Sequence, residues 1–187
     1  LSAFATYEIR RFTQNPDTLD MMPELPEHLT PYPYDHKVAP KGSENLMWIG
    51  GQLTKQHGSI LTYGATARFG VAGPVAADVH VDGNVSTRFK LLGDTVTVTG
   101  YGKFSNEAAP YLLQHYVSNH FIWENDFGKT RRLRLGGWLS IPHTRTYINV
   151  GVENLQNYIY FNSDCMPVQH RSLIHISEPT RHAQSSY

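Results

Sequence analysis

Three ionisable residues stand two positions apart in the segment from Val75 to Leu91, namely Asp78, His80 and Asp82. Carboxylates and imidazoles bind metal ions and transfer protons, so these residues raise the question of a reactive site. If the segment is a β-strand, the three side chains share one face, but neighbours on that face lie roughly 7 Å apart. A charged strand surface explains that spacing more simply than a metal site. We therefore expect no bound metal here.

The remaining reactive residue types do not build a catalytic site either. His115 and His120 stand an odd number of positions apart, so on one strand they would face opposite sides. The sequence contains no GxSxG motif, no phosphate-binding GxxxxGKS/T motif and no HExxH motif. The single cysteine, Cys165, excludes an internal disulfide and a cysteine-based metal cluster. We expect a protein that is not an enzyme and that uses no cofactor.

The composition excludes two further classes of protein. The chain has 16 Lys and Arg residues against 16 Asp and Glu residues, so it has no net positive charge with which to hold nucleic acid. We expect no nucleic-acid partner. No run approaches the roughly 18 apolar residues of a transmembrane helix. This excludes spanning by helices and leaves spanning by β-strands open.

The charged residues alternate with apolar ones, and this alternation is the main structural signal. From Val75 to Leu91 the odd positions are mostly apolar and the even positions mostly polar, over a segment that would extend roughly 55 Å. Successive side chains of a strand point to opposite faces, so such a segment predicts a strand with one apolar and one polar face. The pattern recurs strongly in residues 61–69, 96–104, 132–141 and 147–153, and more weakly in 3–12, 45–54 and 115–127.

Short segments rich in glycine, proline or polar residues separate these predicted strands. Short connections join neighbouring strands in antiparallel order, which predicts an all-β antiparallel meander. Residues 15–44 are the exception, because they carry six prolines and predict a long irregular loop. Gly136 and Gly137 lie inside a predicted strand, where we expect them to relieve crowding opposite bulky Trp138 or Tyr147 or to mark a bend.

Alternation alone does not tell whether the apolar face meets a protein core or lipid. The polar face carries more charge than one side of a thin sandwich needs, and an aqueous lumen accommodates it; we therefore favour a closed transmembrane barrel. The alternative is a soluble antiparallel barrel or sandwich. The residues expected to line the pore are Arg68, Asp78, His80, Asp82, Arg88, Lys90, Lys103, Glu124, Arg132, Arg134 and Glu153. Those expected to face lipid are Tyr63, Phe69, Val79, Val81, Val85, Phe89, Leu133, Leu135 and Val150.

Residues 115–162 contain SNHFIWENDF before a basic hairpin, the glycine pair, and NVGVEN followed by NYIYFN. With these motifs the segment resembles the putative porin family of Bacteroides-type bacteria. The resemblance implies part of a β-barrel in the bacterial outer membrane, with lipid around it and small solutes diffusing through a polar, charged lumen. Two alternatives stay open: a barrel portion of a larger outer-membrane receptor or transporter, and a soluble β-sandwich or barrel module that binds, for instance, carbohydrate.

The end of the chain does not continue the alternation of apolar and polar residues. Residues 172–181 read SLIHISEPTR, which resembles the conceptual translation of a sequencing-library adapter. We expect residues 172–187 to be an unstructured artefact of sequence assembly, and residues 1–171 to be a partial barrel from a truncated gene; a natural polar tail is the alternative. The oligomeric state, the full number of strands and the transported solute do not follow from the sequence.

Overall fold

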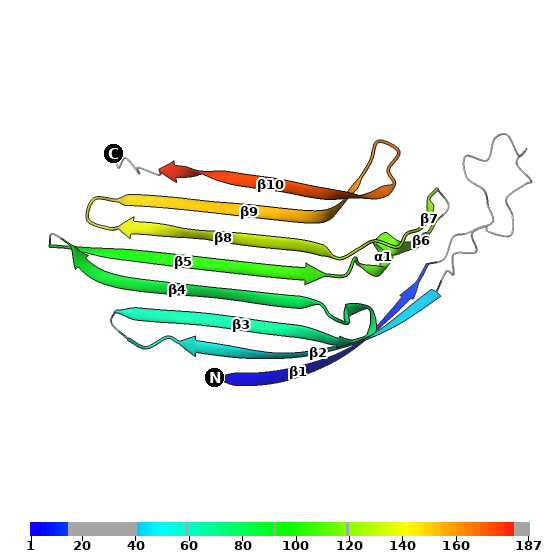
Figure 1. The fold of residues 1–187 in the computed structure, drawn as a ribbon, viewed down its shortest axis with the longest axis horizontal. Coiled ribbons are helices and arrows are strands. Elements are labelled where there is room, and N and C mark those ends of the chain that lie inside the picture. The colour runs from blue at the N-terminus through cyan, green and yellow to red at the C-terminus, as the bar shows by residue number, and fades with distance from the viewer. Residues whose placement is uncertain (15–40, 59, 92, 119, 182–187) are drawn as a thin grey trace, which may run out of the picture.

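The computed structural model describes residues 1–14, 41–58, 60–91, 93–118 and 120–181, the last ten of these by their backbone alone. Eight strands form one antiparallel sheet in the order β1-β2-β3-β4-β5-β8-β9-β10 (Figure 1). Their bounds are Ser2–Thr13 (β1), Lys41–Lys55 (β2), Leu61–Ala72 (β3), Val79–Leu91 (β4), Asp94–Glu107 (β5), Thr130–Ile141 (β8), Thr146–Phe161 (β9) and Pro167–Arg181 (β10). The predicted all-β antiparallel fold is confirmed.

One predicted strand is shorter than its alternation suggests. Val75 ends a 3-10 turn, η2 (Gly73–Val75), Ala76 and Ala77 continue the turn, and β4 begins only at Val79. Pro74 opens this turn, and Ala77 has a φ of 61°, in the left-handed region that a strand cannot contain. The 13 residues of β4 extend about 40 Å instead of the predicted 55 Å.

The weak prediction over residues 115–127 is only partly right. A short helix, α1 (Tyr111–Gln114), precedes two three-residue strands, β6 (His115–Val117) and β7 (Ile122–Glu124). These two strands pair with each other and form a separate small sheet. Of the predicted proline-rich loop, residues 15–40 lie outside the described residues, and residues 41–44 belong to β2.

The carboxyl-terminal stretch differs from the expectation that it has no regular structure. The backbone of β10 continues through residues 172–181 and pairs antiparallel with β9, with a register shift between Ser177 and Thr180. Residues 182–187 lie outside the described part of the chain. As far as Arg181, the stretch therefore forms the last strand of the sheet.

The described residues bury very little apolar surface. The buried hydrophobic side chains are those of Leu46, Val75, Val96, Ala109 and Val117. The alternative of a β-sandwich requires a second layer packed on the apolar face of the sheet. In the part of the chain that the structure describes, no such layer covers it: Val81, Val85, Leu135 and Val150 are 42–53% exposed. No described helix is long and apolar enough to cross a bilayer.

The connections at the two ends of the sheet differ in length. At one end β1 stops at Thr13 and β2 starts at Lys41, and the same end holds residues 73–78, 108–118, 120–129 and 162–166, which include η2, α1, β6 and β7. At the other end β2 stops at Lys55 and β3 starts at Leu61, β4 stops at Leu91 and β5 starts at Asp94, and residues 142–145 join β8 to β9. Figure 1 shows α1, β6 and β7 gathered at the right-hand end of the strands. We call these the long-connection end and the short-turn end.

Candidate functional site

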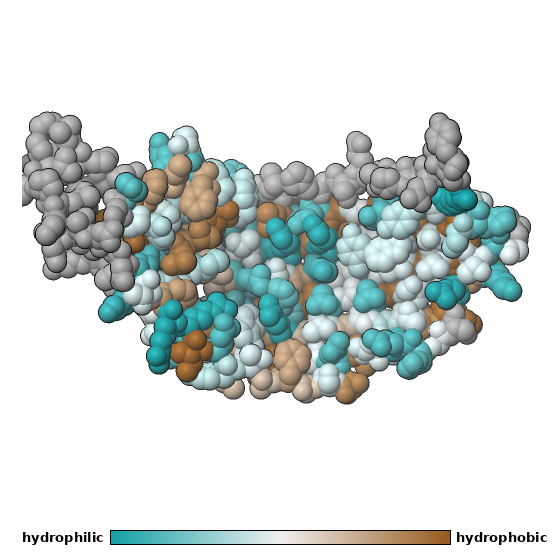
Figure 2. Space-filling view, turned by 180° about the vertical axis from the view of Figure 1, so that it is seen from behind, coloured by the Kyte–Doolittle hydropathy of each residue, from teal (hydrophilic) through white to brown (hydrophobic). Residues whose placement is uncertain are grey.

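The register of the strands sorts the predicted site residues onto two faces. Residues directly opposite each other in an antiparallel sheet point to the same side. Arg68 pairs with His80, Asp82 with Lys103, and Arg134 with Glu153, so these charged residues share one face, here called the polar face. One face of the sheet is seen in Figure 2, where teal and pale residues cover more of its middle than brown ones do.

The apolar face holds every residue that was predicted to face lipid. Phe69 pairs with Val79, Tyr63 with Val85, and Leu135 with Val152, all on the side opposite to the charged residues. Most of these side chains are exposed, and Tyr63 and Val79 are partly buried. The members of this face named in the prediction are Tyr63, Phe69, Val79, Val81, Val85, Phe89, Leu133, Leu135 and Val150.

Four charged residues form a row across the middle of the polar face. Asp82 on β4, Lys103 on β5, Arg134 on β8 and Glu153 on β9 are successive direct partners. Glu153 accepts hydrogen bonds from Nε (3.0 Å) and Nη2 (2.6 Å) of Arg134. Its other carboxylate oxygen lies 3.0 Å from Nε of Arg132. One carboxylate thus bridges two arginines.

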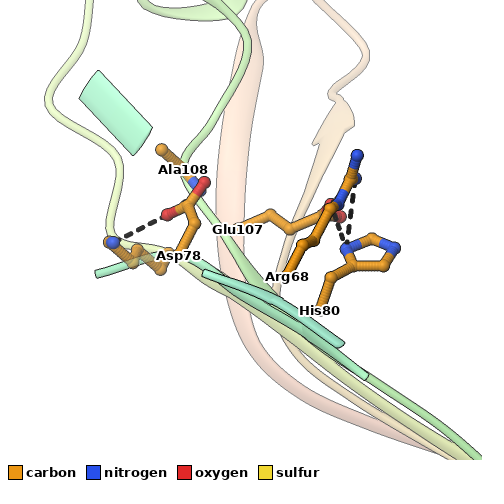
Figure 3. Close-up of polar contacts among 6 residues, drawn as sticks. Arg68, Asp78, His80, Glu107 and Ala108 are labelled. Carbon is orange, nitrogen blue, oxygen red and sulfur yellow. Dashed lines mark hydrogen bonds and ion pairs between the residues drawn. The ribbon is translucent and has the colours of Figure 1, made fainter. Parts of the chain in front are cut away.

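A second cluster lies on the same face near the long-connection end, where three side chains from β3, β4 and β5 point toward one another (Figure 3). Nδ1 of His80 lies 2.7 Å from Oε1 of Glu107, and Nη2 of Arg68 lies 3.6 Å from the same oxygen. The Arg68 guanidinium also stacks on Trp48, with its carbon 4.7 Å from the ring centroid. Glu107 therefore forms one cluster with Arg68 and His80, two of the predicted pore residues.

Asp78 differs from the other predicted pore residues because it does not lie on the strand that the alternation predicts. It lies in the turn before β4 and is only 2% exposed. Its carboxylate accepts hydrogen bonds from the backbone N–H of Ala108 at 3.1 Å and from Nζ of Lys129 at 2.6 Å (Figure 3). Ala108 and Lys129 are the first and last residues of the 108–129 connection. Asp78 therefore binds both ends of that connection to the turn that precedes β4.

Of the other predicted pore residues, one lies outside the large sheet and two lie on its polar face. Glu124 lies on β7, outside the large sheet, with its Oε1 3.9 Å from Nδ1 of His115. Arg88 and Lys90 lie on the polar face of β4 opposite Thr97 and Thr95, toward the short-turn end. They are exposed. The charges of the polar face are thus spread along the length of the strands.

A cavity of about 410 Å³ opens on the polar face at the long-connection end. Trp48, Arg68, Glu107 and Tyr111 are among its lining residues. Sequence reasoning missed Trp48, Glu107 and Tyr111. Glu107 continues the polar phase of the alternation in Tyr101 and Lys103, so extending that run would have found it. Nothing in the sequence pairs Tyr111 with the sheet.

A family model described as putative porin matches residues 1–187, the whole chain. The chain belongs to the putative porin family. No curated protein and no solved structure matches it. The porin assignment agrees with the sheet, in which long strands carry an exposed apolar face and a charged face. Within this porin chain, the polar face is the candidate functional surface.

Proposed function

We propose that this chain forms part of the wall of a β-barrel in the bacterial outer membrane, through which small polar solutes diffuse without chemical change. One observation carries the proposal: long strands expose valine, leucine and phenylalanine on one face and charged residues on the other. Lipid is the solvent that accommodates such an uncovered apolar face, and a water-filled lumen accommodates the charges. Family membership supports a porin-like role.

The length of the apolar face fits a bilayer. On β4 it runs from Val79 through Val81, Val85 and Phe89 to Leu91. This is about 40 Å along the strand and, at a tilt of about 45°, about 28 Å across the membrane. The apolar band of outer-membrane barrels is about 25 Å tall. The strands are therefore long enough to cross the bilayer.

The two edges of the sheet must be paired in the membrane. In the described part of the chain, β1 and β10 are the edge strands. Unpaired backbone N–H and C=O groups cost several kcal/mol each in hydrocarbon, so an open sheet does not persist there. We infer that the sheet closes into a barrel when the whole reading frame that contains this chain is expressed.

The asymmetry of the connections supports one orientation. Outer-membrane barrels have short periplasmic turns and longer extracellular loops. We infer that the long-connection end faces the cell exterior and the short-turn end the periplasm. The cavity lined by Trp48, Arg68 and Glu107 would then lie at the outer mouth of the lumen.

Reconstitution tests the proposal. The protein encoded by the whole reading frame is expressed in a Gram-negative host, recovered from the outer-membrane fraction in detergent, and added to planar bilayers. Stepwise ion conductance without nucleotide or proton gradient is the expected result. Recovery in the soluble fraction as a monomer would overturn the membrane location, and outer-membrane protein without conductance would favour the receptor or transporter alternative.

A further inference from the structure

We propose that Lys103, Arg132 and Arg134 form a binding subsite for an anionic solute group, a phosphate or a carboxylate, on the polar face. The proposal rests on the proposed function, because the face must line a water-filled passage for a solute to reach it. It adds a chemical class of solute and the residues that hold it.

The register brings the three cations together. Lys103 on β5 is directly opposite Arg134 on β8, and its neighbour on the same face, Ser105, is directly opposite Arg132. Cβ atoms of such partners lie about 4.5–5.5 Å apart. Like charges placed directly opposite each other destabilise a sheet. This arrangement therefore costs folding free energy.

The neighbouring acids do not neutralise this group. Glu153 bridges Arg132 and Arg134 and offsets one charge of three. Asp82, opposite Lys103 on β4, offsets a second charge at longer range, since in the described part of the chain it makes no ion pair with Lys103. A positive excess remains around Lys103 and Arg132.

Three other basic residues near the long-connection end each lie within 4 Å of a carboxylate. Arg10 pairs with Glu8 at 2.8 Å, Arg68 lies 3.6 Å from Glu107, and Lys129 pairs with Asp78 at 2.6 Å. By contrast, Arg132 and Arg134 share one carboxylate, that of Glu153, and Lys103 makes no ion pair in the described part of the chain. An anionic ligand would supply negative charge that balances the positive excess around Lys103 and Arg132.

The donors of the group suit an oxyanion. The side chains of Arg132 and Arg134 are 54% and 50% exposed, so a solute can reach them. Nε of Arg132 lies 3.0 Å from the carboxylate of Glu153. A guanidinium fork and a lysine ammonium together bind phosphate or carboxylate through charge-assisted hydrogen bonds.

Calorimetric titration of the detergent-solubilised full protein with inorganic phosphate tests the subsite without relying on conductance. We expect the double variant K103Q/R132Q to bind phosphate about tenfold more weakly, as the loss of a charge-assisted hydrogen bond predicts. The matched control is R131Q, because Arg131 is adjacent in sequence but lies on the apolar side, opposite Asn106. E153Q should bind phosphate more tightly than the wild type, since it removes the bridging carboxylate.

The outcomes separate this inference from the proposed function. Weaker binding in K103Q/R132Q with unchanged binding in R131Q supports the subsite, even if the protein conducts no ions. Equal phosphate affinity in the wild type and K103Q/R132Q overturns the subsite, even in a conducting channel. In bilayers, phosphate should also reduce chloride conductance of the wild type more than that of K103Q/R132Q.

Discussion

Tyr101 on β5 and Gly136 on β8 are direct partners, and the Tyr101 ring lies over the glycine. A Cβ at position 136 would lie 2.5 Å from the Tyr101 hydroxyl oxygen and 2.9 Å from the carbonyl oxygen of Val150. The ring also contacts Trp138, with centroids 5.7 Å apart. Gly136 therefore relieves crowding, as expected, but the bulky partner is Tyr101 and not a residue of its own hairpin.

Replacing this glycine should destabilise the sheet. G136A should lower the free energy of unfolding by about 1–3 kcal/mol, because the methyl group meets both the Tyr101 ring and backbone. The matched control is G100A, since a Cβ at Gly100 meets no atom closer than 3.8 Å. Urea titration in detergent compares the two variants with the wild type. Equal stability of G136A and G100A would show that the ring does not depend on the glycine.

The buried carboxylate of Asp78 should matter more for stability than its charged neighbours. D78A leaves the Ala108 N–H without its acceptor and the Lys129 ammonium without a counter-charge, with only the Ala76 carbonyl oxygen as partner, and should cost about 3 kcal/mol. D82A removes a carboxylate of the polar face that makes no ion pair in the described residues, and should cost less than about 1 kcal/mol. Urea titration measures both, and limited proteolysis should cut D78A faster within residues 108–129. A similar cost for the two variants would contradict the role of Asp78.

The sequence predicts the register of strands that a short turn joins, but not that of strands joined by a long connection. The turns at residues 92–93 and 142–145 fix the register within their hairpins, so counting back from them pairs Asp82 with Lys103 and Arg134 with Glu153. The meeting of Lys103 and Arg134 could not be predicted, because residues 108–129 separate their strands and no turn sets that register.

Asp78 was misplaced for a different reason. The alternation of apolar and polar residues continues through Val75 and Ala77, so it predicts a strand there. Alternation carries no information on dihedral angles, and Ala77 adopts a positive φ. Proline at position 74 was the available signal that the turn extends further along the chain.

An exposed valine can distinguish lipid from water as the solvent of the apolar face. Val85 lies midway along β4 and is 47% exposed, so in water V85K would change stability little. In a bilayer, a lysine near the midplane of the lipid face costs about 2–4 kcal/mol. N84K, on the polar face of the same strand, is the matched control and should be tolerated. Folding yield in lipid vesicles, measured over a urea series, checks this; equal yields of V85K and N84K would remove the support for a lipid-facing surface.

The orientation of the barrel can be read with a native probe. Cys165 is exposed in the 162–166 turn at the long-connection end. If that end faces outward, a membrane-impermeant maleimide should label Cys165 in intact cells that express the whole reading frame. H143C in a C165S background places the probe in the 142–145 turn at the opposite end, where the His143 side chain is 78% exposed. It should react only after the outer membrane is permeabilised, because short turns of outer-membrane barrels face the periplasm. Labelling of H143C but not of Cys165 in intact cells would reverse the orientation, and the cavity near Trp48 would then open toward the periplasm.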